Sequence, residues 1–158
     1  MDGKFDSRHP LVGLSDELIR LNGRLKSLFS GPRRNAGLGD SEMGVLNAVV
    51  EAESAPTVPQ IGRSFGQPRQ QVQRAANGLM AAGLVEAVPN PDHKRAVLLR
   101  ATERGMALKR EIDAEADARA ESLAGGLDAE DVRAVTRGLG AIRRELEAHL
   151  RGHDSGRA

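Results

Sequence analysis

The sequence contains no cysteine, tryptophan or tyrosine, and its only aromatic side chains are three phenylalanines. The absence of cysteine excludes disulfide bonds, cysteine-ligated zinc sites and regulation by thiol oxidation. With so few aromatic side chains, the core must be built from Leu, Val, Ile, Met and Ala. An alanine-rich core buries less apolar area per residue, and an obligate dimer would supply the missing burial.

Long apolar runs are missing as well. No stretch approaches the roughly 18 apolar residues that indicate a membrane helix, and residues 1–4 begin no signal peptide. We therefore expect a cytoplasmic protein with no membrane partner.

The residue patterns of common active sites are also lacking. We find no Ser-His-Asp arrangement, no glycine-rich phosphate loop and no cluster of metal ligands. His149 and His153 are four residues apart, but two ligands are fewer than a zinc site uses. We expect no catalysis, no cofactor and no metal.

Charge is distributed unevenly, although the formal net charge is only +1. Residues 59–110 contain nine basic and three acidic side chains, a net charge of +6. Residues 111–131 contain eight acidic side chains and one basic one, a net charge of −7. A basic segment suits contact with a polyanion. The acidic stretch is more typical of a solvated helix face.

The spacing of apolar residues predicts a mainly α-helical chain. About six helices are expected, at 11–29, 40–54, 59–65, 68–82, 102–123 and 128–151. Asp40, Thr102 and Asp128 are expected to cap the second, fifth and sixth of these helices. Residues 1–10 are expected to be a flexible N-terminus and residues 152–158 a disordered tail.

The segment 40–110 has the pattern of a winged helix-turn-helix. Gly66-Gln67 predicts a tight turn between two helices, and Gly83 is typical of a helix C-terminus. Strands are expected at 84–88 and 97–99, joined by a turn that contains Asn90, Pro91 and Asp92, of which Asp92 is a candidate Asx-turn residue. The two strands make a small β-hairpin, the wing, directly after the second helix.

The second helix of this motif is the candidate DNA-recognition helix. Such a helix places its N-terminal residues at base edges in the major groove. Those residues are Pro68, Arg69, Gln70, Gln71, Gln73 and Arg74. Arginine can donate two hydrogen bonds to guanine, and glutamine can pair with adenine. No acidic residue occurs from 69 to 85, as expected beside phosphates. The alternative is an ordinary exposed helix face.

The wing tip carries a second group of candidate DNA contacts. It consists of Asp92, His93, Lys94 and Arg95. Basic side chains at this position can enter the minor groove, whereas the alternative is a solvated turn. A winged helix used only to bind another protein is the competing function, and the basic segment argues against it.

These segments resemble the MarR (multiple antibiotic resistance regulator) family. The resemblance rests on residues 61–74, on residues 83–86 and, most specifically, on the wing and its exit, residues 90–105, and it covers about 11–150. It implies a transcription regulator, most often a repressor, that binds an inverted repeat in double-stranded DNA. It also implies a homodimer formed by the terminal helices, 11–35 and 115–151.

The resemblance extends to single residues and shows three departures, one of which is Ala101, where family members usually have Leu before the capping threonine. The family's wing arginine falls on Arg95, with Lys94 as a phosphate or groove contact. His93 stands where family members often have the aspartate that orients this arginine, and Asp92 is the nearest substitute. Pro68 stands where a small hydroxyl residue often caps the recognition helix, which leaves the capping role to Gln67.

Many members of that family release DNA when a small anionic or aromatic ligand binds beside the DNA-binding domain. The corresponding candidates in this chain are Arg20, Arg24, Met43, Leu46 and Met106. Their residue types have a simpler explanation as well, because the apolar ones suit the core and the arginines suit a solvated surface.

Overall fold

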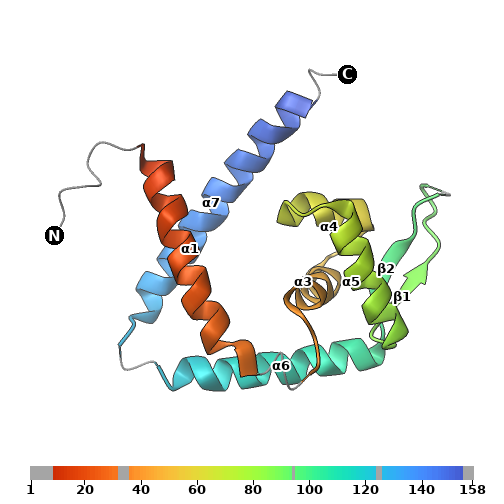
Figure 1. The fold of residues 1–158 in the computed structure, drawn as a ribbon, viewed down its shortest axis with the longest axis horizontal. Helices are drawn as coiled ribbons and strands as arrows, with labels where there is room; N and C mark the ends of the chain where they lie inside the picture. Colours follow the sequence, from red (N-terminus) through yellow and green to blue (C-terminus); the bar gives the residue numbers. More distant parts are fainter. Residues whose placement is uncertain (1–8, 32–35, 94, 124–125, 155–158) are drawn as a thin grey trace. The chain divides into compact units, whose positions relative to one another are not determined.

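The computed structural model describes residues 9–31, 36–93, 95–123 and 126–154. Within them it contains six α-helices and one two-stranded antiparallel sheet (Figure 1). The elements are α1 (Pro10–Leu28), α3 (Asp40–Glu51), α4 (Val58–Phe65), α5 (Arg69–Ala81), β1 (Val85–Val88), β2 (Leu98–Ala101), α6 (Glu103–Glu121) and α7 (Ala129–Asp154). The predicted mainly helical chain with a small hairpin is confirmed. The chain forms two compact units that divide between residues 117 and 118.

The core of the first unit lies between α3, α4, α5 and the hairpin. Its buried residues are Val45, Leu46, Val49, Val58, Ile61, Val72, Ala75, Ala76, Leu79, Leu84, Val85 and Leu99. Because Ala75 and Ala76 have small side chains on the buried side of α5, α3 packs closely against this helix. The result is a small aliphatic platform that fixes the direction of α5.

The N-termini of α3 and α4 are fixed by local hydrogen bonds, and they correct two predicted boundaries. The cap of α3 is Gly39 and not Asp40, because the Glu42 side chain accepts from the Gly39 amide at 2.9 Å. Asp40 is the first helical residue and pairs with Lys26 at 2.8 Å. Thr57 caps α4 together with Gln60 in a reciprocal capping box, so that helix begins one residue earlier, at Val58.

Two further helix boundaries differ from the prediction. α3 ends at Glu51, where Ala52 is already extended, and not near residue 54. α1 begins at Pro10, which the predicted flexible segment included, and the His9 ring accepts from the amide of Leu11 at 3.2 Å. Helix ends are the least certain part of a periodicity argument, since only the buried turns carry a clear pattern.

Two glycines in the left-handed conformation make the turns of the helix-turn-helix. Gly66 has φ +61° and follows α4, and Gly83 has φ +69° and follows α5. After α5 the amide of Leu84 donates to the carbonyl of Leu79 at 2.9 Å, which closes the helix as a Schellman motif. Both turns were predicted from these glycines, and both are confirmed.

The hairpin pairs Val85 with Ala101 and Val88 with Leu98. The first strand begins one residue later than the predicted 84–88, and the second spans residues 98–101 and not the predicted 97–99. The outer edge of β2 is also occupied, because the Leu99 amide donates to the Pro56 carbonyl at 2.8 Å. This bond ties the wing to the loop that precedes α4.

The start of α6 is joined closely to the end of α5. Thr102 caps α6 as predicted, since its hydroxyl accepts from the Gly105 amide at 3.1 Å, and it also donates to the Gly83 carbonyl at 2.8 Å. The Arg104 guanidinium donates to the Ala82 carbonyl at 3.0 Å. A Cβ added at Gly105 would lie 2.0 Å from the Leu84 carbonyl oxygen. The two helices are therefore connected by a tight backbone junction.

The second unit contains α7, which begins after Asp128 as predicted. The Asp128 carboxylate accepts from the amides of Glu130 and Asp131 at 2.7 and 3.2 Å. The helix continues to Asp154, so the first residues of the predicted disordered tail, 152–154, are helical. The prediction had ended the helix near Gly152 because glycine disfavours helix, but this position is tolerated.

α1 and α7 both leave apolar side chains uncovered. α1 has no buried residue, although Leu11, Leu18, Leu21 and Leu25 repeat along it at helical spacing. On α7, Val132, Val135, Leu146 and Leu150 are exposed. In the described part of the chain, no helix is long and apolar enough to cross a membrane.

Candidate nucleic-acid interface

The outward face of α5 is the centre of the candidate interface. Val72, Ala75, Ala76 and Leu79 form its buried stripe. A helix advances by 100° per residue, so the side chains opposite this stripe are those at 70, 74 and 77. Gln70, Arg74 and Asn77 are indeed exposed, at a spacing of four and then three residues. The face presents two amides and one guanidinium, and no acidic group.

The other predicted residues of the recognition helix lie beside this row. Arg69 is exposed on the first turn. Pro68 occupies the N-cap position and makes no side-chain capping bond, and its carbonyl accepts from the amides of Gln71 and Val72. Gln67 contributes a backbone bond to the preceding turn, where its amide donates to the Gly62 carbonyl at 2.9 Å.

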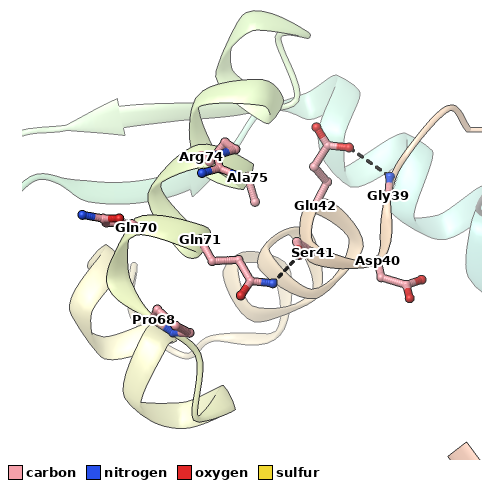
Figure 2. Close-up of a pocket in the computed structure, with 9 residues that line it drawn as sticks. All are labelled: Gly39, Asp40, Ser41, Glu42, Pro68, Gln70, Gln71, Arg74 and Ala75. Carbon is pink, nitrogen blue, oxygen red and sulfur yellow. Dashed lines mark hydrogen bonds between the residues drawn. The ribbon is translucent and has the colours of Figure 1, made fainter.

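Two of the three predicted glutamines donate hydrogen bonds from their side-chain amides to other side chains of the protein. Gln71 donates to the hydroxyl of Ser41 on α3 at 3.0 Å, and Gln73 donates to the side-chain oxygen of Asn77 at 3.0 Å. Figure 2 shows Gln71 turned toward Ser41, whereas Gln70 points away from α3. Gln70 therefore has the most open position of the three.

An open pocket of about 570 Å³ lies between the first turn of α3 and the N-terminal half of α5 (Figure 2). It is lined by Gly39, Asp40, Ser41, Glu42, Pro68, Gln70, Gln71, Arg74 and Ala75. Its two carboxylates are already engaged, because Asp40 pairs with Lys26 and Glu42 accepts from the Gly39 amide. The pocket thus joins the first turn of α3 to the arginine and glutamine side chains of α5.

Gly78 explains how α3 comes so close to α5 at this place. A Cβ added at Gly78 would lie 2.4 Å from the Glu42 carboxylate, which occupies the space that the missing side chain leaves. Glycine in a helix interior costs about 1 kcal/mol relative to alanine. Here that cost is offset by the room it gives to the capping carboxylate of α3.

Gly78→Ala is therefore expected to change the free energy of unfolding by less than about 0.5 kcal/mol, because the gain in helix propensity and the lost Glu42 cap are each about 1 kcal/mol. In a Glu42→Ala background the same change is expected to stabilise by about 1 kcal/mol. Urea unfolding of the four variants measures this coupling. Gly44→Ala is the control, since nothing lies within 4 Å of its added Cβ. Equal effects of Gly78→Ala in both backgrounds would contradict the explanation.

The wing tip is ordered by Asn90 and not by Asp92. The side chain of Asn90 accepts from the Asp92 amide at 3.0 Å, which is the Asx turn that the sequence suggested for Asp92. Asp92, His93 and Arg95 are exposed, and Lys94 lies outside the described residues. Among the ion pairs of the described residues, none joins Asp92 to Arg95.

At the base of the wing, Glu86 and Arg100 face each other across the two strands. The Arg100 guanidinium lies 2.8 Å from the Glu86 carboxylate. The pair is exposed, so it contributes little stability, but it neutralises the one acid of β1. Further basic groups of the described motif are Arg63 on α4, Arg69 and Arg74 on α5 and Arg95 at the wing tip.

The candidate ligand residues are distributed over several environments. Met43 and Leu46 are buried, and Leu46 belongs to the core. Met106 is exposed on α6. Arg20 pairs with Glu17 on α1 at 3.3 Å, and Arg24 lies with it along a shallow hollow on the same helix. These positions leave the ligand site a prediction.

Lys109 is a buried charge that sequence reasoning missed. Its ammonium contacts the Asp113 carboxylate at 2.5 Å and lies 3.7 Å from Glu51 at the end of α3. The spacing of four residues between Lys109 and Asp113 is a signal for the first contact. The second joins α6 to α3, and the sequence contains no sign of it.

Comparison with known proteins agrees with this arrangement. A sequence model described as the MarR family matches residues 36–96. Rv2011c of Mycobacterium tuberculosis and Mb2034c of Mycobacterium bovis are each 39% identical over 97 residues, which is 58% of this chain and 68% of theirs.

Solved structures with the same fold are more distant in sequence. A MarR-family regulator from Rhodococcus sp. RHA1 has a TM-score of 0.74 and 22% identity, covering 87% of this chain and 96% of its own. NadR in complex with 4-hydroxyphenylacetate has a TM-score of 0.74 and 21% identity over 87% and 95%. MarR of E. coli has a TM-score of 0.67 and 21% identity over 86% and 98%.

The fold of these regulators is the one built here from α3, α4, α5 and the hairpin, and it is a fold of transcription regulators and not of enzymes. The family match covers the helix-turn-helix and the wing, which are the parts that carry the candidate interface. The chain therefore belongs to the MarR family of winged-helix transcription regulators.

Proposed function

We propose that the chain is a homodimeric repressor that binds an inverted-repeat operator in double-stranded DNA. The observation that carries this proposal is the outward face of α5, where Gln70, Arg74 and Asn77 stand in one row with no acid among them. The basic tip of the wing supports it, because Arg95 is exposed. A helix and a flanking hairpin arranged in this way suit a major groove and the minor groove beside it.

The proposed dimer places two such surfaces on one operator. Its half-sites would lie about 10 base pairs apart, one turn of the DNA helix, or a multiple of this distance. The uncovered apolar faces of α1 and α7 support a dimer, since they would otherwise remain exposed to water.

Release of DNA by a small anionic or aromatic ligand is a further part of the proposal. Three proteins of the same fold support it: CouR was solved with p-coumaroyl-CoA, NadR with 4-hydroxyphenylacetate, and DNA binding by BpsR is regulated by 6-hydroxynicotinic acid. In this chain Arg20 and Arg24 are the cationic candidates, while Met43, Leu46 and Met106 are the apolar ones.

The Arg74→Ala and Arg95→Ala variants are expected to bind operator DNA about 10- to 100-fold more weakly than the parent, because each loses a charged contact to bases or phosphates. The loss for Arg95 should shrink as salt rises, since its contact is mainly electrostatic. Gel shifts at several salt concentrations measure both effects.

Arg137→Ala on α7 is the matched control, because that arginine is exposed as well but lies outside the helix-turn-helix. Parental affinity of both Arg74→Ala and Arg95→Ala would contradict the proposed interface. Absence of a salt-sensitive shift of the parent with promoter DNA would favour the alternative, a winged helix that binds protein only.

A further inference from the structure

Asn77 lies at the far end of the outward row of α5, two helical turns beyond Gln70. Seven residues of helix span about 10 Å, which matches three base pairs of DNA at about 3.4 Å each. A side chain at 77 is therefore placed to contact a different base pair from those that Gln70 and Arg74 contact. The sequence pattern that points to it is the spacing of four and three residues from 70 to 74 to 77.

The side chain of Asn77 is held by a neighbour. Gln73 is half-buried, and its amide donates to the Asn77 side-chain oxygen at 3.0 Å. This bond defines which end of the Asn77 amide faces Gln73. An amide oxygen has two lone pairs and an amide nitrogen two hydrogens. One lone pair is used, so Asn77 still has one acceptor site and two donor sites.

This set of groups is what adenine requires in the major groove. Adenine presents its N6 amino group as a donor and N7 as an acceptor, and asparagine can bind both at once. A fixed amide loses less rotamer entropy when it binds than a freely rotating one. Gln73 would therefore act on the base through Asn77 and not by its own contact.

We propose that Asn77, oriented by Gln73, specifies an adenine in the operator half-site, about three base pairs from the one that Gln70 contacts. Asn77 is the specificity-determining residue and Gln73 is a positioning residue. The inference rests on the proposed DNA-binding function, and it adds a residue beyond the first two turns of α5, where the other candidate base contacts lie.

Selection of bound sequences from a random DNA library by the full-length protein tests this inference. The parent is expected to require A at one position of each half-site, and Asn77→Ala to lose about 10- to 100-fold of that preference while keeping the others. Asn77→Asp is expected to shift the preference at that position from A to C, because a carboxylate can only accept, and cytosine presents a donor there.

Gln73→Ala is expected to lower the preference for A by a smaller factor, about 3- to 10-fold, because Asn77 keeps its groups but loses its orientation. Asn22→Ala, an exposed asparagine of α1, is the control and should leave every position unchanged. Unfolding in urea shows whether Asn77→Ala and Gln73→Ala remain folded; a purely structural role would lower stability without altering base preference.

The outcomes separate the two proposals. Sequence-specific binding by the parent with unchanged base preferences in Asn77→Ala overturns the role of Asn77 and leaves the proposed function standing. Absence of any sequence-specific binding by the parent, at low salt and with the protein folded, overturns the proposed function and the role of Asn77 with it.

Discussion

A double variant with charges on the apolar stripe of α7, Val135→Glu with Leu146→Glu, is expected to bind an inverted-repeat operator about 10²- to 10⁴-fold more weakly than the parent. Linking two half-site contacts in one dimer makes the second contact intramolecular, and its loss removes an advantage of that size. Each contact by a single winged helix would remain, so binding to one isolated half-site should change little.

The physical reason is the pattern of the stripe itself. Its apolar residues recur at steps of three and four along the helix, at positions 132, 135, 139, 142, 146 and 150. Val135 is 58% exposed and Leu150 64% exposed in the single chain. Such a repeat is the seam by which two helices pack against each other. Burying an unpaired glutamate carboxylate in that seam costs several kcal/mol.

Sedimentation velocity measures the oligomeric state, and gel shift measures the affinity for operator DNA. Ala141→Glu is the control, because residue 141 is exposed on the opposite side of the same helix and a charge there should leave the dimer intact. A double variant that sediments as a dimer and binds operator like the parent would overturn the assignment of α7 to the interface.

The sequence was sufficient to predict the helix-turn-helix because the residues that end its helices are recognisable by type. Gly66 and Gly83 both adopt positive φ, and few residues other than glycine do so readily. The turns were thus predicted within a residue, and the helices between them followed from periodicity. Thr102 was predictable for a similar reason, because threonine is a preferred N-cap residue, and its hydroxyl caps α6.

The capping residues that were predicted wrongly had competitors close by. Asp40 is a good cap by type, but Glu42 satisfies the Gly39 amide instead, which moves the helix start back by one residue. At the wing tip Asn90 and Asp92 are both suited to an Asx turn, and Asn90 forms it. Local residue types restrict such choices to a few positions, and tertiary packing selects among them.

The candidate interface was only partly predictable, because the direction of a side chain depends on its neighbours. Gln71 looked equivalent to Gln70 in the sequence, yet Ser41 of α3, thirty residues earlier, accepts its hydrogen bond. Asn77 was not predicted, because it lies beyond the N-terminal turns with which a recognition helix is expected to meet the base edges. Lys109 is paired with Glu51 only through the fold.

Gly105→Ala is expected to lower the free energy of unfolding by about 3 kcal/mol, at the upper end of the usual cost of inserting atoms into a packed site. The added Cβ would lie 2.0 Å from the Leu84 carbonyl oxygen, and this is backbone that cannot rotate away. Relief requires α6 to move from α5. That movement would weaken the bonds from Thr102 to Gly83 and from Arg104 to Ala82.

Urea unfolding provides the measurement, with Gly44→Ala as the control, which has open space around its Cβ and should be stabilised by up to about 1 kcal/mol. A Gly105→Ala variant as stable as the parent would show that α6 approaches Leu84 less closely than described. If instead the destabilised variant still binds operator DNA at parental affinity when fully folded, the junction supports the fold alone. If affinity falls in the folded variant, the direction of α5 depends on its junction with α6.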